Sequence, residues 1–150
     1  MTKGYGYRDF SKKIKNDSNT MYLIGSANKF VTGLILIQLE EEKKIKLTDN
    51  VNLYIPHFSD RFPITIRDLM LHQSGLRKYN RNPNFHGLNE SIIHIQKNGV
   101  DPKYYLKNKY NDVNYIVLSK IIENVTNSDY SSALNNYIVN KSSLNHTSLF

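Results

Sequence analysis

The chain has 150 residues, of which 39% are hydrophobic and 22% are charged, and a formal net charge of +7. This length and composition favour one globular domain, and the absence of cysteine excludes disulfides and thiol catalysis. The positive charge fits a solvated surface that keeps the chain soluble, and it would also attract polyanionic partners: a wall polymer, an anionic membrane surface that the chain would bind peripherally, or nucleic acid. No zinc-finger, RRM or helix-turn-helix pattern accompanies the charge, which argues against nucleic acid.

The N-terminal third is predicted to place a strand before a long helix. Small and aromatic residues alternate over Gly4–Tyr7, which is typical of a short strand, and residues 10–20 are predicted to form a turn with a return segment. From Ser26 onward, apolar residues recur at three- and four-residue spacing until the charged run at 40–44, which predicts a helix ending there. These apolar residues are Phe30, Val31, Leu34, Ile35 and Leu39.

The next segment is predicted to hold turns and one short helix. Residues 47–50 have turn composition, and Pro56 is expected to end an extended piece. The spacing of Thr65 and Asp68 is that of a capping box, which predicts a helix start. Gly75 is expected to stop this helix.

The last third is predicted to be mainly helical. A polar loop over 77–83 is followed by predicted helices over 88–97, 113–125 and 130–139. Asn127 tolerates the left-handed conformation that closes a helix, so it is expected to end the second of these. The chain as a whole is therefore predicted to be a helical stretch preceded by a strand or hairpin.

Ser26 and Lys29 are the first residues that point to chemistry. A serine hydroxyl is a weak nucleophile unless a base takes its proton, and a lysine three positions later on a helix lies on the same face. Desolvation lowers the pKa of a lysine amine and fits it to act as that base. The alternative interpretation is a helix-capping serine beside a solvated lysine.

Five segments resemble the class C β-lactamases and their esterase and D,D-peptidase relatives, in the same order and at similar spacing. An S-x-x-K pair is a known feature of β-lactamases and penicillin-binding proteins. The resemblance covers nearly the whole chain, and His72 within it is interpreted as structural. The segments are Lys3–Tyr7, Tyr22–Phe30, Leu47–Val51, Tyr54–Pro56 and Ile64–Leu76.

Tyr110 and Asp112 match a second element of that family, in which a Tyr-x-Asn triplet is usual and the tyrosine relays a proton. Asp112 departs from this pattern, and Tyr-x-Asp resembles the FmtA-type branch, which removes D-alanine esters from teichoic acids. Residues two apart in an extended loop point to one side, so both side chains are expected to face Ser26. Asp112 is expected to accept a hydrogen bond from Lys29 and to raise its pKa. The alternative for Asp112 is a cap of the following helix.

The resemblance implies an α+β fold of the β-lactamase/transpeptidase type, of which this chain supplies mostly the helical part plus an N-terminal strand or hairpin. The family's third element, a Lys/His-Thr/Ser-Gly triplet on a later strand, has no match after Tyr110, because His146 and Thr147 are followed by Ser148. We therefore expect residues 1–150 to be a partial serine hydrolase domain, a truncated member that lacks the C-terminal sheet strands.

The resemblance further implies a serine hydrolase that works through an acyl-enzyme on D-alanyl esters of teichoic acid in the cell envelope. Ser26 would attack, Lys29 would activate it, and Tyr110 would relay protons beside Asp112. A D,D-peptidase or β-lactamase and a non-catalytic remnant that binds wall polymer are the alternatives. No cofactor or metal is expected, since the five histidines lack metal-ligand spacing. The sequence shows no signal peptide or membrane span, which as written predicts the cytoplasm, whereas the family acts in the envelope.

Overall fold

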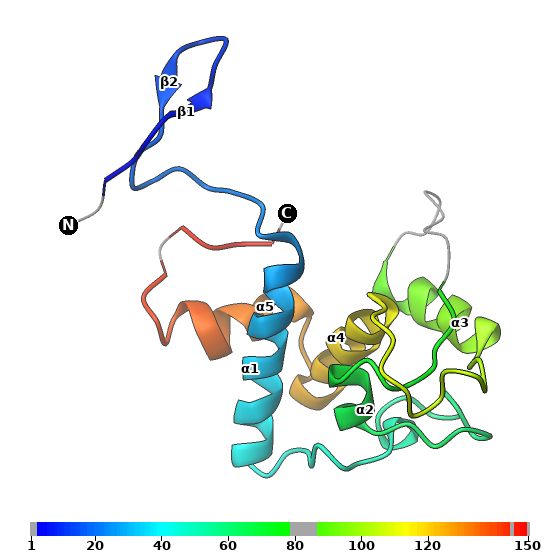
Figure 1. Cartoon of the computed structure of the whole chain (residues 1–150). Helices are drawn as coiled ribbons and strands as arrows, with labels where there is room; N and C mark the ends of the chain where they lie inside the picture. Colours follow the sequence, from blue (N-terminus) through cyan, green and yellow to red (C-terminus); the bar gives the residue numbers. More distant parts are fainter. Residues whose placement is uncertain (1–2, 79–86, 145, 150) are drawn as a thin grey trace.

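The computed structural model describes residues 3–78, 87–144 and 146–149. It shows a helical body from which a small hairpin projects (Figure 1). Short 3-10 turns precede α1 and follow it, and a π-helical turn follows α5. In chain order the strands and helices are β1 (Tyr7–Asp9), β2 (Ile14–Lys15), α1 (Asn28–Glu41), α2 (Ile66–Met70), α3 (Leu88–Asn98), α4 (Val113–Thr126) and α5 (Tyr130–Leu134).

The hairpin confirms the predicted turn with a return segment. β1 and β2 pair antiparallel, with Tyr7 opposite Lys15, and the register is irregular before the turn. The predicted strand over Gly4–Tyr7 is wrong in its position, because pairing begins only at Tyr7. The reason is Gly6, whose φ of 71° leaves the extended region and interrupts a strand at that point.

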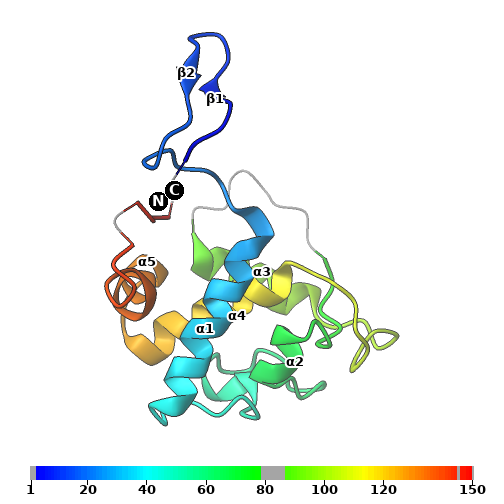
Figure 2. The same cartoon turned by 60° about the vertical axis from the view of Figure 1, so that its left-hand side comes forward.

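α1 and α4 form the centre of the helical body. Ile35 and Leu39 of α1 and Leu118 and Ile121 of α4 are fully buried, because their four- and three-residue spacing directs each pair to one face of its helix. α1 packs against α4 and against the π-helical turn after α5 (Figures 1 and 2). Phe30, which the periodicity placed on this face, is 71% exposed and belongs to the surface instead.

The segment between α1 and α2 is compact rather than extended. The predicted extended piece before Pro56 is wrong, since Val51–Leu53 forms a 3-10 turn. The side chain of Asn50 accepts a hydrogen bond from the Asn52 amide at 2.8 Å, which favours a turn over a strand. Val51 is buried in the core, so the turn also supplies an apolar contact.

The predicted capping box at the start of α2 is confirmed. The Thr65 hydroxyl accepts from the Asp68 amide at 3.1 Å, and the Asp68 carboxylate accepts from the Thr65 amide at 2.9 Å. The helix ends at Met70 and does not continue to Gly75. His72 has a φ of 56°, so the chain has already turned away from the helical path before Gly75.

The helices of the last third agree with the predictions. α3 ends at Gly99, and α4 ends where Asn127 adopts the left-handed conformation, with φ 50° and ψ 37°. The predicted helix over 130–139 is α5 continued by the π-helical turn over Asn135–Val139. The predicted polar loop over 77–83 lies mostly outside the described residues.

Two segments distant in sequence lie side by side and hold the loop before α4. The Lys109 amide donates to the His72 carbonyl at 2.8 Å, and the Asp101 amide donates to the Gly75 carbonyl at 2.8 Å. A side chain at Gly75 would place its Cβ 2.7 Å from the Tyr105 amide nitrogen, and the φ there is 69°. Only glycine allows this approach, which sets the path of the chain into Tyr110.

Candidate active site

Ser26 lies at the N-terminal end of α1, within the 3-10 turn Gly25–Ala27. The α-helix proper begins at Asn28, two residues later than the sequence pattern predicted. Lys29 lies in its first turn, and its Nζ donates to the Ser26 Oγ at 3.2 Å. The predicted pairing of Ser26 with Lys29 on one face is therefore present in the structure.

Tyr110 and Asp112 reach the same point from the loop before α4. The Tyr110 hydroxyl is 2.9 Å from the Ser26 Oγ and donates to the Asp112 Oδ1 at 3.0 Å. The Lys29 Nζ lies 2.6 Å from that same Oδ1 atom. The four residues predicted from sequence thus form one closed set of hydrogen bonds, and the loop presents both Tyr110 and Asp112 toward Ser26.

Asp112 does not act as a helix cap, although it occupies the N-cap position of α4. Its carboxylate is turned toward Lys29, and no side-chain capping bond is formed. Asn111 supplies a bond to the helix start instead, because its Oδ1 accepts from the Val113 amide at 3.2 Å. The predicted N-cap position of Asp112 is therefore confirmed, but its carboxylate forms no capping hydrogen bond.

The electrostatics of the set favour a charged lysine. Burial lowers the pKa of Lys29, but hydrogen bonds with Asp112 and Tyr110 outweigh it and raise the pKa above its ordinary value. The hydrogen bonds from Lys29 and Tyr110 lower the pKa of Asp112. At neutral pH Lys29 is thus an ammonium that donates to Ser26 and Asp112, so the Ser26 proton points to Tyr110.

A group of neighbouring side chains holds Tyr110 in place: His72 contacts its ring, and Asn111 and Asn114 contact His72. The His72 ring lies against the Tyr110 ring, with centroids 4.6 Å apart. The Asn111 amide donates to the His72 Nδ1 at 3.3 Å, and the Asn114 side-chain amide lies 3.0 Å from the same atom. Burial lowers the pKa of His72, which favours a neutral ring, and its Nδ1 also lies 3.2 Å from the Asn111 carbonyl.

Sequence reasoning missed this supporting layer. Asn114 was not singled out, and His72 was interpreted only as structural, although its ring contacts a proposed site residue. Tyr115 also belongs to this layer, since its ring centroid lies 5.4 Å from that of His72 and 5.5 Å from the Lys29 Nζ. The one available signal was the position of His72 inside the long resembling segment.

A pocket opens beside the nucleophile, between α1, α4 and the start of α3. Ser26, Lys29 and Thr32 line it from the α1 side. Asp112 and Tyr115 line it from the α4 side. An acyl group that enters this pocket would reach the Ser26 Oγ next to polar hydrogen-bonding groups.

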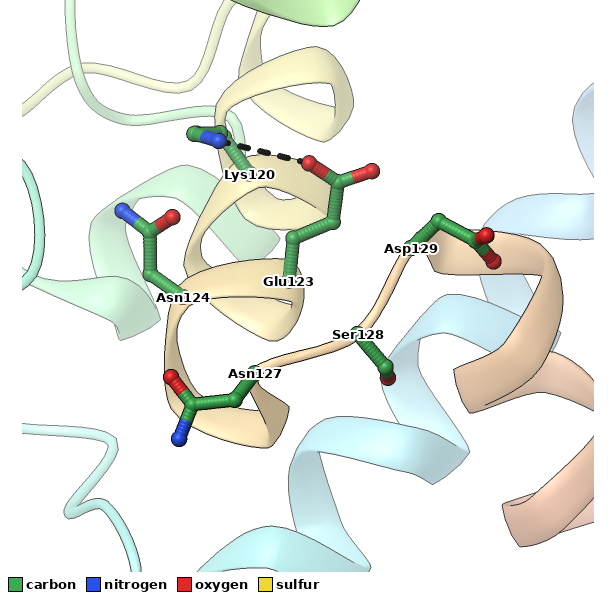
Figure 3. A pocket seen from close by; sticks show the side chains of 6 residues that line it. All are labelled: Lys120, Glu123, Asn124, Asn127, Ser128 and Asp129. Carbon is green, nitrogen blue, oxygen red and sulfur yellow. Dashed lines mark hydrogen bonds and ion pairs between the residues drawn. The ribbon is translucent and has the colours of Figure 1, made fainter.

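A separate pocket lies at the C-terminal end of α4 and at the start of α5 (Figure 3). The Lys120 Nζ pairs with the Glu123 carboxylate at 3.3 Å, as the dashed line in Figure 3 shows. Glu123 also accepts from the Tyr130 amide, and Asn124 donates to the Tyr54 carbonyl at 2.8 Å. Glu123 and Asn124 thus connect α4 to neighbouring segments, whereas the ion pair of Lys120 with Glu123 lies within α4.

Within residues 3–78, 87–144 and 146–149, no three His, Cys, Asp or Glu side chains gather where they would hold a metal ion. None of the helices in these ranges combines the length and the apolar character that a membrane span requires.

Comparison with known proteins identifies relatives of the whole chain. The family model described as Beta-lactamase matches residues 1–150. The teichoic acid D-alanine hydrolase of Staphylococcus aureus is 52% identical over 150 residues, which cover all of this chain and 38% of that protein. The chain thus spans well under half of the length of this curated relative.

Solved structures confirm the predicted fold class. The crystal structure of FmtA from Staphylococcus aureus matches with a TM-score of 0.90 at 53% identity, over 97% of this chain and 41% of that one. The octameric penicillin-binding protein homologue from Pyrococcus abyssi matches with a TM-score of 0.77 at 25% identity, over 95% of this chain and 36% of that one. The resemblance stated from sequence is therefore confirmed.

Proposed function

The chain belongs to the beta-lactamase family, and from this premise we propose that it carries the nucleophile of a serine hydrolase that works through an acyl-enzyme. The observation that carries the proposal is the position of the Ser26 Oγ, which lies 3.2 Å from the Lys29 Nζ and 2.9 Å from the Tyr110 hydroxyl. A hydroxyl held between an amine and a second proton-carrying group has the arrangement that an activated serine requires.

In the proposed reaction, Ser26 attacks the carbonyl carbon of the substrate and forms an acyl-enzyme. The neutral form of Lys29 accepts the Ser26 proton, and Tyr110 donates its proton to the departing oxygen and takes the proton of Lys29 in its place, so that both groups are restored. Water then attacks the acyl group, its proton passes through the same two groups to the Ser26 oxygen, and the acid leaves. Because Asp112 contributes to the raised pKa of Lys29, only a small fraction of Lys29 is neutral at pH 7, and the reaction is expected to accelerate as pH rises.

We propose that the substrate is a D-alanyl ester of teichoic acid. Support comes from the Staphylococcus aureus relative, which is named for this activity and is 52% identical to the chain. An ester also suits the site, since its alkoxide group leaves more readily than the amine of a peptide. Cleavage of an ester therefore depends less on the strength of Lys29 as a base. Teichoic acid lies in the bacterial cell envelope, so this substrate places the activity there.

The experiment that tests the proposal is intact-mass spectrometry of the purified chain. The chain is incubated with a fluorophosphonate and, separately, with a penicillin, and Ser26→Ala is the matched control. We expect a fluorophosphonate adduct on the chain and none on the variant. A D-alanyl ester of glycerol is then supplied, and release of D-alanine is measured with the same pair.

The outcomes separate the alternatives. Failure of the folded chain to form any Ser26-dependent adduct would contradict the proposal and favour a non-catalytic binding role. Efficient acylation by penicillin without release of D-alanine from the ester would favour a D,D-peptidase or β-lactamase instead. Circular dichroism of both proteins shows that they are equally folded before either conclusion is drawn.

A further inference from the structure

A groove adjoins the proposed site at Tyr110. It is lined by Arg77 and Lys78 of the segment after α2 and by Asp101, Tyr104 and Lys109 of the segment between α3 and α4. Tyr110 also lines it, so the residue whose hydroxyl contacts Ser26 is shared by the groove and the site. We call these six residues the cationic groove.

The walls of the cationic groove are joined by hydrogen bonds that end on backbone carbonyl groups. The Arg77 amide donates to the Gly99 carbonyl at 3.0 Å, and the Asn111 side-chain amide donates to the Leu76 carbonyl at 2.7 Å. Together with the bond from Lys109 to the His72 carbonyl, they keep the two segments at a fixed separation. The groove is therefore formed before any ligand enters, which reduces the entropy that binding must offset.

The groove carries more positive charge than its own acid neutralises. Arg77 lies 3.8 Å from Asp101. Among the residues that the structure describes, Lys78 and Lys109 have no carboxylate within ion-pair distance. The Lys109 Nζ lies 3.3 Å from the centroid of the Tyr104 ring, and its hydrogen bond lowers the pKa of the Tyr104 phenol.

The surrounding sequence adds to this charge. The stretch from residue 69 to residue 89 contains no Asp or Glu, and neither does the stretch from 102 to 111. The described parts of these stretches instead contain five basic residues, which are Arg77, Lys78, Lys103, Lys107 and Lys109. The pocket of Figure 3 differs, because Glu123 and Asp129 accompany its one lysine. The groove is thus suited to an anion, whereas that pocket is not.

We propose that the cationic groove binds phosphate groups of a polyol phosphate chain and thereby presents an ester on the same chain to Ser26. This inference rests on the proposed function, because a teichoic acid has a phosphodiester in every repeat. A phosphodiester carries one negative charge, which the ammonium groups of Lys78 and Lys109 match without a bidentate geometry. The groove acts in binding and not in the chemical step.

The test measures binding of unsubstituted poly(glycerol phosphate) to the 150-residue chain by isothermal titration calorimetry. This polymer has the phosphates but no ester, so the result does not depend on hydrolysis. The variants are Lys78→Gln, Lys109→Gln and the double variant. Lys12→Gln is the matched control, because it removes the same charge from an exposed lysine of the hairpin.

We expect each groove variant to bind about threefold more weakly and the double variant about tenfold more weakly, with a shallower dependence on salt. The control should bind like the unaltered chain. Equal weakening in the control, or unchanged binding in the double variant, would overturn the inference. Equally tight binding of duplex DNA with the same losses would also overturn it, since the groove would then not distinguish a polyol phosphate.

This result and the acylation result are independent. Lysine-dependent binding without a Ser26 adduct would support the groove and contradict the proposed reaction. A Ser26 adduct without lysine-dependent binding would support the reaction and contradict the groove.

Discussion

The hairpin and the helical body differ in the solvent exposure of their large apolar side chains. Tyr5 and Phe10 of the hairpin are 75% and 81% exposed, and Leu23 of the connecting segment is 78% exposed. Ile35 and Ile121 of the helical body are fully buried. Hydrophobic composition alone therefore does not define the core, and a side chain is buried only where a facing element covers it.

The difference arises from the partners that each region finds within the chain. α1 meets α4, and α4 meets α2, α3 and α5, so each apolar stripe has a facing surface. Among the described residues, the two strands of the hairpin pair with each other and with no further strand, and an isolated hairpin has little stability of its own in water. All four proposed site residues belong to the helical body, so stability and reactivity should depend on it.

The largest expected effect is on core packing. Ile121→Ala removes a fully buried side chain at the centre of α4 and should lower the free energy of unfolding by about 3 kcal/mol. Urea denaturation followed by circular dichroism measures the change. A loss below about 1 kcal/mol would contradict the assignment of α4 to the centre of the core.

The second expected effect concerns the reactivity of Ser26. Asp112→Asn keeps an oxygen that accepts from Tyr110 but removes the negative charge beside Lys29. The pKa of Lys29 should fall, because Asp112 is among the causes that raise it. The neutral base is then available at lower pH, so the midpoint of the rate–pH curve should move down and fluorophosphonate acylation at pH 7 should rise several-fold.

The predicted direction of this shift is tested by measuring the acylation rates of the unaltered chain and of Asp112→Asn across pH. Ser26→Ala supplies the background rate, and thermal melts establish that both proteins stay folded over the range. A midpoint that stays in place or moves up would contradict neutral Lys29 as the base. That outcome would favour proton transfer from Ser26 through Tyr110 to Asp112, along the hydrogen bonds of the structure.

The third effect is smaller and lies at the start of α2. Thr65→Ala removes one half of the capping box and should cost about 1 kcal/mol of unfolding free energy. Thr65→Ser keeps the accepting oxygen and is the matched control. Equal losses in both variants, measured by urea denaturation, would show that the methyl group and not the cap stabilises this turn.

The smallest effect should come from the hairpin. Phe10→Ala removes a ring that is 81% exposed and should change the free energy of unfolding by about 0.5 kcal/mol or less. The same denaturation experiment gives the value. A loss as large as that of Ile121→Ala would contradict the difference between the hairpin and the helical body, because it would mean that the Phe10 ring packs against a buried partner.

The sequence predicted correctly those features that depend on residues close together in the chain. The spacing of Ser26 and Lys29 predicted their contact, since three residues in a helix lie within one turn. The Thr65 cap and the left-handed Asn127 were likewise predicted from residue type and position. The Gly4–Tyr7 strand was misplaced, because the alternation of residues carries no information on the backbone dihedrals of Gly6.

Contacts between segments distant in sequence were predicted only where the family resemblance implied them. The position of Tyr110 and Asp112 beside Ser26 was expected from the resemblance, and the structure brings these three together. The support of Tyr110 by His72 and Asn114 was not expected, since their hydrogen bond joins residues 42 positions apart. Nothing in the periodicity of either segment indicates that they meet.

The hydrogen bond between Ser26 and Tyr110 closes a loop of 84 residues. Closing a loop of this length has an entropic cost, which the packing of α1 against α4 helps to offset. The unfolded chain therefore keeps Ser26 near Lys29 but not near Tyr110. Acylation of Ser26 would then report the folded fraction directly, so that a labelling reagent could follow refolding of the whole helical body in time.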